Sequence, residues 1–399
     1  MKKNTTTPQR RNFLKNLGLS ALPVLLPAAS MASGLPLDTT HQQKQAPINF
    51  IFDGLWFSPQ AYLDKLQEIN QKQKIAPDFY GNGGATQKLE NAFAKLTGKE
   101  KAIFLPTGTM ANQLAIKLLN GDNTKVLVPE NSHVFRDEAD AAQEVHGKRL
   151  VPVGQGKPFF DLQDLKRTIR YYNEGEVFKS GIGTVMIESP VRRADGVAIP
   201  FNTLKAITDY CREKGYKTHL DGARIHLASA YTGVSVAQYA SLFDTVYISL
   251  YKYLNASSGA ILCGKAEVID KLAHQIKVYG GTAFQTWNAT AMALHYLEGI
   301  EDRWKKVKNN AEQIMSALNK MEGIQIKKVT NGTNIFHLKL DASIDLKTLA
   351  NTLFKTHNIW LGRANKEGIV KFTINESLLR RTPKQIVDAW KQALGKAKK

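Results

Sequence analysis

The chain has 399 residues, of which 43% are hydrophobic, and a formal net charge of +19 at pH 7. This length and apolar content suffice for one large domain and a smaller one, and they exclude a chain that is disordered throughout. The positive charges are mostly single lysines and arginines without an aromatic-basic motif beside them, so we expect no nucleic-acid partner. Two cysteines, Cys211 and Cys263, allow one disulfide at most, which excludes a fold built on a disulfide framework.

The N-terminus has the three parts of an export signal. Arg10 and Arg11 precede an uncharged apolar run and a small-residue stretch that ends at Ala32. This order resembles a twin-arginine signal peptide, and the apolar run is too short to span a membrane. We predict a signal peptide at residues 1–32, a linker or arm at residues 33–46 and no membrane span after signal removal. The protein is then a passenger of the twin-arginine export machinery and resides in the periplasm.

The next part of the chain contains a possible anion site. An apolar run at residues 102–105 predicts a buried strand, and Thr107, Gly108 and Thr109 follow it at the start of a helix. The free N–H groups and the dipole of a helix N-terminus favour a bound phosphate. A threonine in such a turn can also be a plain helix N-cap, so this segment alone does not decide between the two interpretations.

Further along the chain, Asp221 and Lys252 each follow a strand candidate, at residues 216–220 and 245–250. In an open α/β sheet the carboxyl ends of the strands line the ligand crevice. Pyridoxal phosphate needs a lysine for its aldehyde, a carboxylate for its ring nitrogen and backbone donors for its phosphate. Taken alone, the pair has a simpler interpretation, in which Asp221 caps a turn and Lys252 is a solvated lysine.

Several motifs together extend this hypothesis. There are four such segments: residues 80–119, Glu130–Phe135, Asp221–Arg224 and Gly280–Gln285. Together they resemble the threonine aldolase and β-eliminating lyase family, whose members are fold-type-I pyridoxal phosphate enzymes. The resemblance begins near residue 48 and fades in the last hundred or so residues.

The resemblance implies an α/β fold of the pyridoxal-phosphate-dependent transferase type, with a mostly parallel seven-stranded sheet, helices on both faces and a small C-terminal α+β domain. We expect the large cofactor-binding domain at residues 47–285 and an interdomain helix with the small domain at residues 286–399. The last two strands are joined by too few residues for a parallel crossover, so we expect the last strand to be antiparallel. The strands are expected at residues 102–105, 125–128, 150–153, 184–187, 217–220, 246–249 and 260–263.

The resemblance also assigns roles to residues. Lys252 would hold the cofactor as a Schiff base, and Asp221 would pair with its ring nitrogen. His133 would stack on the ring and relay protons, although a histidine at a strand end can also be purely structural. Arg224 would reach the cofactor's phenolic oxygen or the substrate, and its alternative is a surface ion pair. Thr107, Gly108 and Thr109 would cradle the phosphate.

Three departures from the family pattern concern the substrate. Tyr251 and Tyr253 flank the lysine where the family has a serine and a glycine, and two phenols there would reshape the site. Phe52-Asp53-Gly54 replaces the family's Ser-Asp-Thr stretch, which leaves Asp53 as a substrate-binding candidate. The small-domain arginine that clamps the substrate carboxylate is not evident, and Arg363 and Lys371 are its possible substitutes.

The sequence therefore predicts a periplasmic pyridoxal-phosphate-dependent lyase that cleaves a β-hydroxy-α-amino acid to glycine and an aldehyde. Its partner would be a small amino-acid substrate, without a metal, and the subunits would form a homodimer or homotetramer by analogy. Two alternatives remain open. One is β-elimination or racemisation on the same cofactor, and the other is an exported binding or scaffold protein that keeps the fold with weak catalysis.

Overall fold

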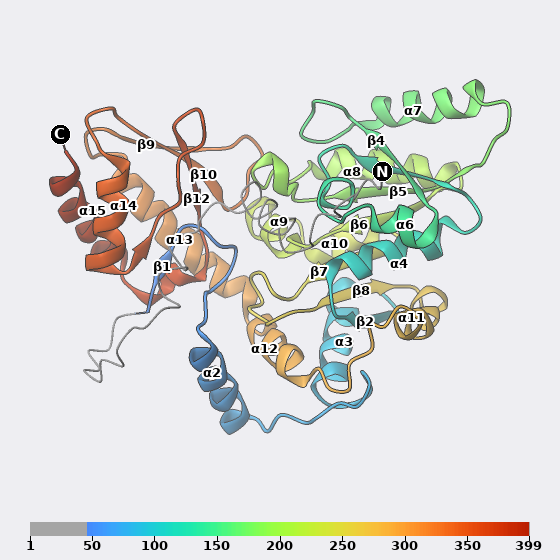
Figure 1. The fold of residues 1–399 in the computed structure, drawn as a ribbon, viewed down its shortest axis with the longest axis horizontal. Helices are drawn as coiled ribbons and strands as arrows, with labels where there is room; N and C mark the ends of the chain where they lie inside the picture. Colours follow the sequence, from blue (N-terminus) through green and yellow to red (C-terminus); the bar gives the residue numbers. More distant parts are fainter. Residues whose placement is uncertain (1–45, 399) are drawn as a thin grey trace, which may run out of the picture.

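The computed structural model describes residues 46–398, so the predicted signal peptide and nearly all of the predicted arm lie outside the described residues. A seven-stranded sheet forms the centre of the larger unit, in the order β2-β8-β7-β6-β5-β3-β4 (Figure 1). The strands are β2 (Lys101–Leu105), β3 (Lys125–Pro129), β4 (Arg149–Val153), β5 (Ile182–Glu188), β6 (Lys217–Asp221), β7 (Thr245–Ser249) and β8 (Ala260–Gly264).

The sheet is parallel except for one strand. β4, β3, β5, β6 and β7 pair in parallel, whereas β8 is antiparallel to both β7 and β2. Every residue of β3, β5, β7 and β8 is buried, as expected for strands covered on both faces. The predicted seven-stranded, mostly parallel sheet with an antiparallel last strand is confirmed.

Helices cover both faces of this sheet. Because successive side chains of a strand point to opposite faces, Val246 and Ile248 join one hydrophobic core and Tyr247 joins the other. The helices of this unit are α2 (Pro59–Lys72), α3 (Gly84–Thr97), α4 (Gly108–Asn120), α5 (His133–Arg136), α6 (Ala141–His146), α7 (Leu162–Gly175), α8 (Phe201–Glu213), α9 (Ile225–Thr232), α10 (Val236–Ser241), α11 (Ala266–Val278) and α12 (Trp287–Leu297). None of the helices in the described part of the chain is long and apolar enough to cross a membrane.

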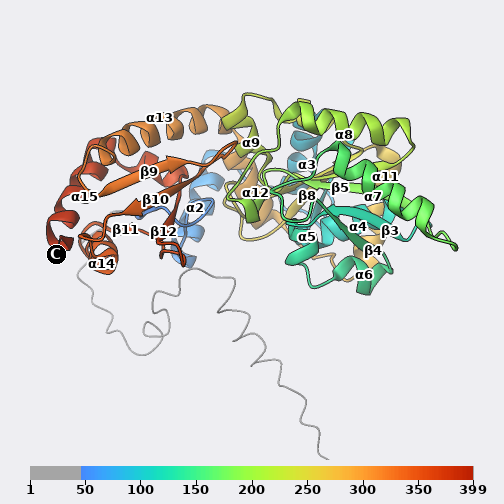
Figure 2. The same cartoon turned by 90° about the horizontal axis from the view of Figure 1, so that it is seen from above.

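The C-terminal unit is a small α+β layer structure beside the larger unit (Figure 2). Its antiparallel sheet has the order β12-β10-β9. The interdomain helix expected after residue 285 consists of two helices, α12 and α13, and Gly299 between them takes a left-handed conformation (φ 63°). The elements of this unit are α13 (Ile300–Leu318), β9 (Ile324–Lys328), β10 (Ile335–Leu340), α14 (Leu346–His357), β11 (Ile359–Trp360), β12 (Ile369–Thr373) and α15 (Pro383–Ala397).

The first described strand, β1 (Ile48–Asn49), belongs structurally to the C-terminal unit, where it pairs in parallel with β11. The residue that follows it, Phe50, stacks on Phe372 with ring centroids 4.0 Å apart and contacts Trp390 edge-on. The described part of the chain therefore begins beside the small unit and passes to the large unit through the loop that contains Asp53.

Candidate active site

A cavity of about 380 Å³ opens at the carboxyl ends of the central strands. Eight of the residues predicted for the site line it, from segments as far apart as the start of α4 and the loop after β7. They are Thr107, Gly108, Thr109, His133, Asp221, Arg224, Tyr251 and Lys252. Parallel strands bring such distant segments together because all their carboxyl ends lie at one edge of the sheet.

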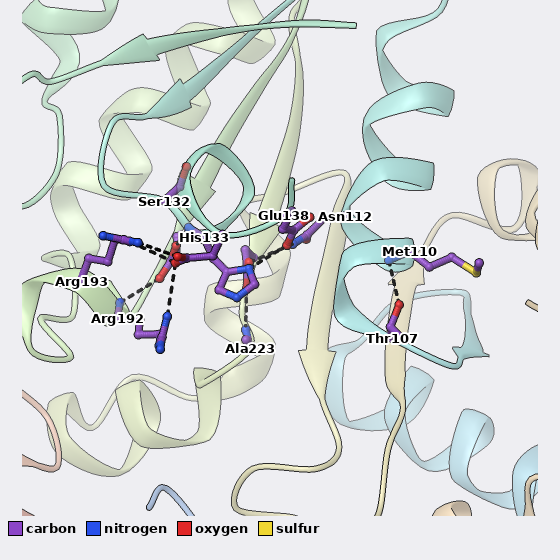
Figure 3. Close-up of polar contacts among 12 residues, drawn as sticks. Thr107, Met110, Asn112, Ser132, His133, Glu138, Arg192, Arg193 and Ala223 are labelled. Atoms are coloured by element: carbon purple, nitrogen blue, oxygen red, sulfur yellow. Dashed lines mark hydrogen bonds and ion pairs between the residues drawn. The ribbon is translucent and has the colours of Figure 1, made fainter. Parts of the chain in front are cut away.

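One end of the cavity is the start of α4. Thr107 is the N-cap of this helix, and its hydroxyl accepts a hydrogen bond of 3.1 Å from the backbone N–H of Met110 (Figure 3). Gly108 cannot be replaced without displacing a neighbour, because a Cβ there would lie 2.1 Å from the hydroxyl oxygen of Tyr247. The first N–H groups of a helix lack intrahelical partners, so this end of the cavity suits an anion.

Asp221 is held from two sides. It is 2% exposed, and its two oxygens accept hydrogen bonds of 3.0 Å from the side-chain amide of Asn112 and from the backbone N–H of Ala223. Asn112 in turn contacts Nε2 of His219 at 3.1 Å, and burial lowers the pKa of His219 to about 4. His219 is therefore neutral at neutral pH. The groups that bond to the carboxylate of Asp221 are neutral amides, so its negative charge remains available to a ligand.

Lys252 lies in the loop after β7, and its half-buried side chain lines the cavity. Burial lowers its pKa to about 8, and the charge of Arg224 acts in the same direction, whereas Asp221 and Asp53 act against it. An amine with this pKa is neutral far more often at pH 7–8 than an ordinary lysine, and the neutral amine is the nucleophilic form. Gly54 packs on the same residue, because a Cβ at Gly54 would come within 2.1 Å of the Lys252 carbonyl oxygen.

Arg224 forms a two-bond ion pair with Asp53. Its Nη2 and Nε lie 2.7 and 3.3 Å from the two carboxylate oxygens, and the two side chains are only 9% and 19% exposed. Burial raises the pKa of Asp53, but the charge and hydrogen bonds of Arg224 outweigh this effect and lower the pKa overall. The alternative predicted for Arg224, a surface ion pair, is therefore wrong about exposure, since both side chains are largely buried. Arg224 lines the cavity, whereas Asp53 lies behind it and is not among the lining residues.

His133 begins α5, and its ring is oriented by a buried carboxylate. Nδ1 of the ring lies 2.9 Å from an oxygen of Glu138 (Figure 3). The backbone N–H of His133 donates to the carboxylate of Glu188 at 2.5 Å. Burial lowers the pKa of His133, but the hydrogen bond and charge of Glu138 outweigh it, so that the pKa is raised. Within residues 46–398 no protein group bonds to Nε2, which is therefore the nitrogen that can act on a ligand.

The other predicted residues lie elsewhere or play a different part. Tyr253 is fully buried and donates to the backbone oxygen of Ala223 at 2.9 Å, so its phenol has a structural partner. Neither Arg363 nor Lys371 is among the residues that line the cavity. Lys371 forms an ion pair of 2.5 Å with Asp195. Among residues 46–398, no group of three or more His, Cys, Asp or Glu side chains is arranged to hold a metal ion.

Sequence reasoning missed several residues of the site. Glu188 is the last residue of β5, accepts hydrogen bonds from two backbone N–H groups, and has a pKa raised to about 7 by burial and by the charge of Asp221. Its position at a strand end was a usable signal, as it was for Asp221. Asn112 and Glu138 lie inside a helix and in a loop, where no local pattern marks them. The lining residues that sequence reasoning missed also include Tyr247, Ser257 and Ser258.

Comparisons with known proteins add to this geometry. A family model described as Beta-eliminating lyase matches residues 67–341. A Candida albicans protein named Low-specificity L-threonine aldolase is 29% identical over 286 residues, which cover 71% of this chain and 73% of that protein. A Cochliobolus carbonum protein named Alanine racemase TOXG is 30% identical over 225 residues, or 56% of each chain.

Among solved structures, a protein of Exiguobacterium sp. 255-15 is similar along nearly its whole length. It is assigned as an aromatic amino acid beta-eliminating lyase/threonine aldolase. The TM-score is 0.72 at 26% identity, and the match covers 88% of this chain and 98% of that chain. The similarity confirms the predicted fold class.

Proposed function

Because the chain belongs to the beta-eliminating lyase family, we propose that it uses pyridoxal phosphate to cleave a β-hydroxy-α-amino acid into glycine and an aldehyde. The observation that carries the proposal is the cavity in which Lys252, Asp221 and the start of α4 converge. The similarity to a low-specificity L-threonine aldolase supports this reaction.

The residues present fit the cofactor at each of its functional groups. The amine of Lys252 would bond to its aldehyde, the buried carboxylate of Asp221 would pair with its ring nitrogen, and residues 107–109 would bind its phosphate. His133 would lie against the ring. When bound, pyridoxal phosphate withdraws electrons from the α-carbon of the amino acid, so that a bond at this carbon can break heterolytically.

The protein must then remove one proton from the substrate. Cleavage of the Cα–Cβ bond leaves the β-carbon as an aldehyde, which requires the β-hydroxyl to lose its proton to a base. Nε2 of His133 is the candidate base, because Glu138 holds Nδ1 at 2.9 Å and stabilises the ring when it becomes charged. The raised pKa makes His133 a stronger base. Only the neutral imidazole can accept a proton, and this form prevails at a pH above that pKa.

A second reaction on the same cofactor is favoured by one observation. The relative named Alanine racemase TOXG is 30% identical over 225 residues, and racemisation begins with the loss of a proton from the α-carbon instead of cleavage of Cα–Cβ. β-Elimination, which the family's name denotes, is a further alternative within this chemistry. An exported binding or scaffold protein with weak catalysis is the remaining alternative.

Two measurements separate these possibilities. The purified protein should show a visible absorbance band that borohydride bleaches, and mass mapping should locate the reduced cofactor on Lys252. The variant Lys252→Ala should lack both signals, and absence of the band from the wild type would leave only the binding or scaffold alternative. Glycine should be released from phenylserine, threonine or allo-threonine, and release from none of them would count against the aldolase reaction.

We also propose that the protein is exported by the twin-arginine route to the periplasm. The order of the Arg10-Arg11 pair, the apolar run and the small residues up to Ala32 supports this proposal. A reporter fused after residue 40 should reach the periplasm, and replacement of both arginines by lysine should abolish its export. Unchanged export of the lysine variant would contradict the proposal.

We propose further that the subunits assemble as a homodimer or homotetramer. Three exposed aromatic residues support this, because Phe79 and Tyr80 both contact Phe284 and each of the three is more than half exposed. Apolar groups clustered on a surface are typical of protein interfaces. Light scattering of the purified protein should give at least twice the mass of one chain, and a monomer at micromolar concentration would contradict this.

A further inference from the structure

A second cavity, of about 510 Å³, adjoins the first. Tyr251 and Ser257 line both cavities, so the two share a wall. The loop that carries Asp53 continues into the second cavity through Leu55 and Phe57. A molecule held at Lys252 therefore has this second cavity beside it.

The second cavity is built for an apolar occupant. None of the residues that line it is charged, and most are apolar: Leu55, Phe57, Pro59, Tyr62, Leu63, Tyr251 and Ala256. Several of its polar atoms already have partners, since Asn255 accepts from the Leu55 N–H at 2.8 Å and Ser58 accepts from the Ala61 N–H at 3.2 Å. The hydroxyl of Tyr62 donates to the Asn288 carbonyl at 3.2 Å and accepts from the Ser257 N–H at 3.0 Å. A polar ligand would gain few hydrogen bonds here, whereas an apolar one would lose its exposure to water.

Tyr251 is the residue that stands between the two cavities. It is 46% exposed, and its ring centroid lies 5.5 Å from Nζ of Lys252. The other tyrosine beside the lysine, Tyr253, is fully buried and fixed to Ala223, so it contributes to neither cavity. Of the two departures from the family pattern at the lysine, only Tyr251 can contact a ligand in these cavities.

We propose that the second cavity binds the side chain of the substrate, and that the preferred substrates carry an aromatic ring on the β-carbon. This inference rests on the proposed function, because it places the α-carbon at Lys252 and the ring beyond Tyr251. A methyl group, as in threonine, fills little of a space of this size. Burial of a whole ring should favour the aromatic substrate by about tenfold or more.

The test introduces a charge into the second cavity and compares it with a matched change elsewhere. Leu63 lines this cavity and is 59% exposed, and Val278, at the end of α11, is equally exposed and lines neither cavity. Leu63→Asp should reduce kcat/KM for phenylserine about tenfold relative to that for threonine, whereas Val278→Asp should leave this ratio unchanged. Equal ratios for the wild type and Leu63→Asp would overturn the inference.

A binding measurement that involves no aldol cleavage keeps this inference separate from the proposed function. Phenylalanine and alanine lack the β-hydroxyl, so neither can undergo the aldol cleavage, and calorimetry can compare their affinities for the holoenzyme. The wild type and Tyr251→Phe should bind phenylalanine about tenfold more tightly than alanine, and Tyr251→Ala and Leu63→Asp should lose this preference. Equal affinities in the wild type would refute the side-chain site. A clear preference without glycine release would refute the aldolase reaction and leave the side-chain site standing.

Discussion

Replacement of Asp53 by asparagine should destabilise the protein much more than the loss of an exposed ion pair. Removing one partner of a fully buried pair costs about 3–5 kcal/mol, because the remaining charge stays desolvated. The side chain of Asp53 keeps 19% of its exposure and that of Arg224 keeps 9%, and asparagine can still accept one hydrogen bond. We therefore expect Asp53→Asn to lower the free energy of unfolding by about 2–3 kcal/mol.

Urea unfolding of the cofactor-free protein, followed by circular dichroism, measures this loss without a contribution from ligand binding. The matched control is Asp388→Asn, which breaks the pair between Asp388 and Lys384, whose side chains are 41% and 85% exposed. We expect this control to change the free energy of unfolding by about 0.5 kcal/mol or less. If Asp53→Asn costs no more than the control, the ion pair at the cavity is not buried as described.

The same variant has a second effect that stability alone does not report. The negative charge of Asp53 raises the pKa of Lys252, against the effects of burial and of Arg224. Asp53→Asn should therefore move this pKa below about 8, and Arg224→Met should move it upward. The pH dependence of the rate at which the cofactor-free protein takes up pyridoxal phosphate reports the fraction of neutral amine. Shifts of the same sign in both variants would refute this account of the charges.

Three further predictions concern other parts of the molecule. Glu138→Gln removes the group that raises the pKa of His133, so the acidic limb of the kcat/KM profile should move to lower pH; an unmoved limb would show that His133 is not the base. Gly108→Ala should weaken cofactor binding at least tenfold in equilibrium dialysis, and Tyr247→Phe should restore part of it, because the added Cβ would lie 2.1 Å from the Tyr247 hydroxyl. Both cysteines are buried and unpaired, with pKa values raised to about 12 by burial, so a thiol reagent should modify them only after denaturation.

The sheet was predictable because most of its strands are short apolar runs bounded by turns or helices. The antiparallel direction of β8 followed from the short connection between Ser249 and Ala260. β1 has only two residues, because the side chain of Asn49 accepts hydrogen bonds from the N–H groups of Ile51 and Phe52 and turns the chain away. Its pairing with β11 joins residues more than 300 positions apart, which no local pattern specifies.

The sequence indicated which residues lie together at the cavity where their positions relative to a strand carried the information. Asp221 is the last residue of β6 and Lys252 lies just after β7, and the topology of a parallel sheet brings such positions together. The ion pair between Asp53 and Arg224 was not predicted, since it depends on the path of a loop. Lys371 was a candidate on residue type alone, as a cation in the small domain. In the structure it forms an ion pair with Asp195 instead.

The C-terminal unit contributes to the charge balance at Lys252 even though it lies outside the cavity. The side-chain amide of Asn375 donates to the backbone oxygens of Asn49 and Phe52, at 2.9 and 2.8 Å, and so fixes the segment that leads to Asp53. Asp53 in turn holds Arg224, and these two charges act on Lys252 in opposite directions. The small unit therefore helps to position Asp53. A movement of this unit relative to the large one would change the ionisation of the lysine as well as the shape of the site.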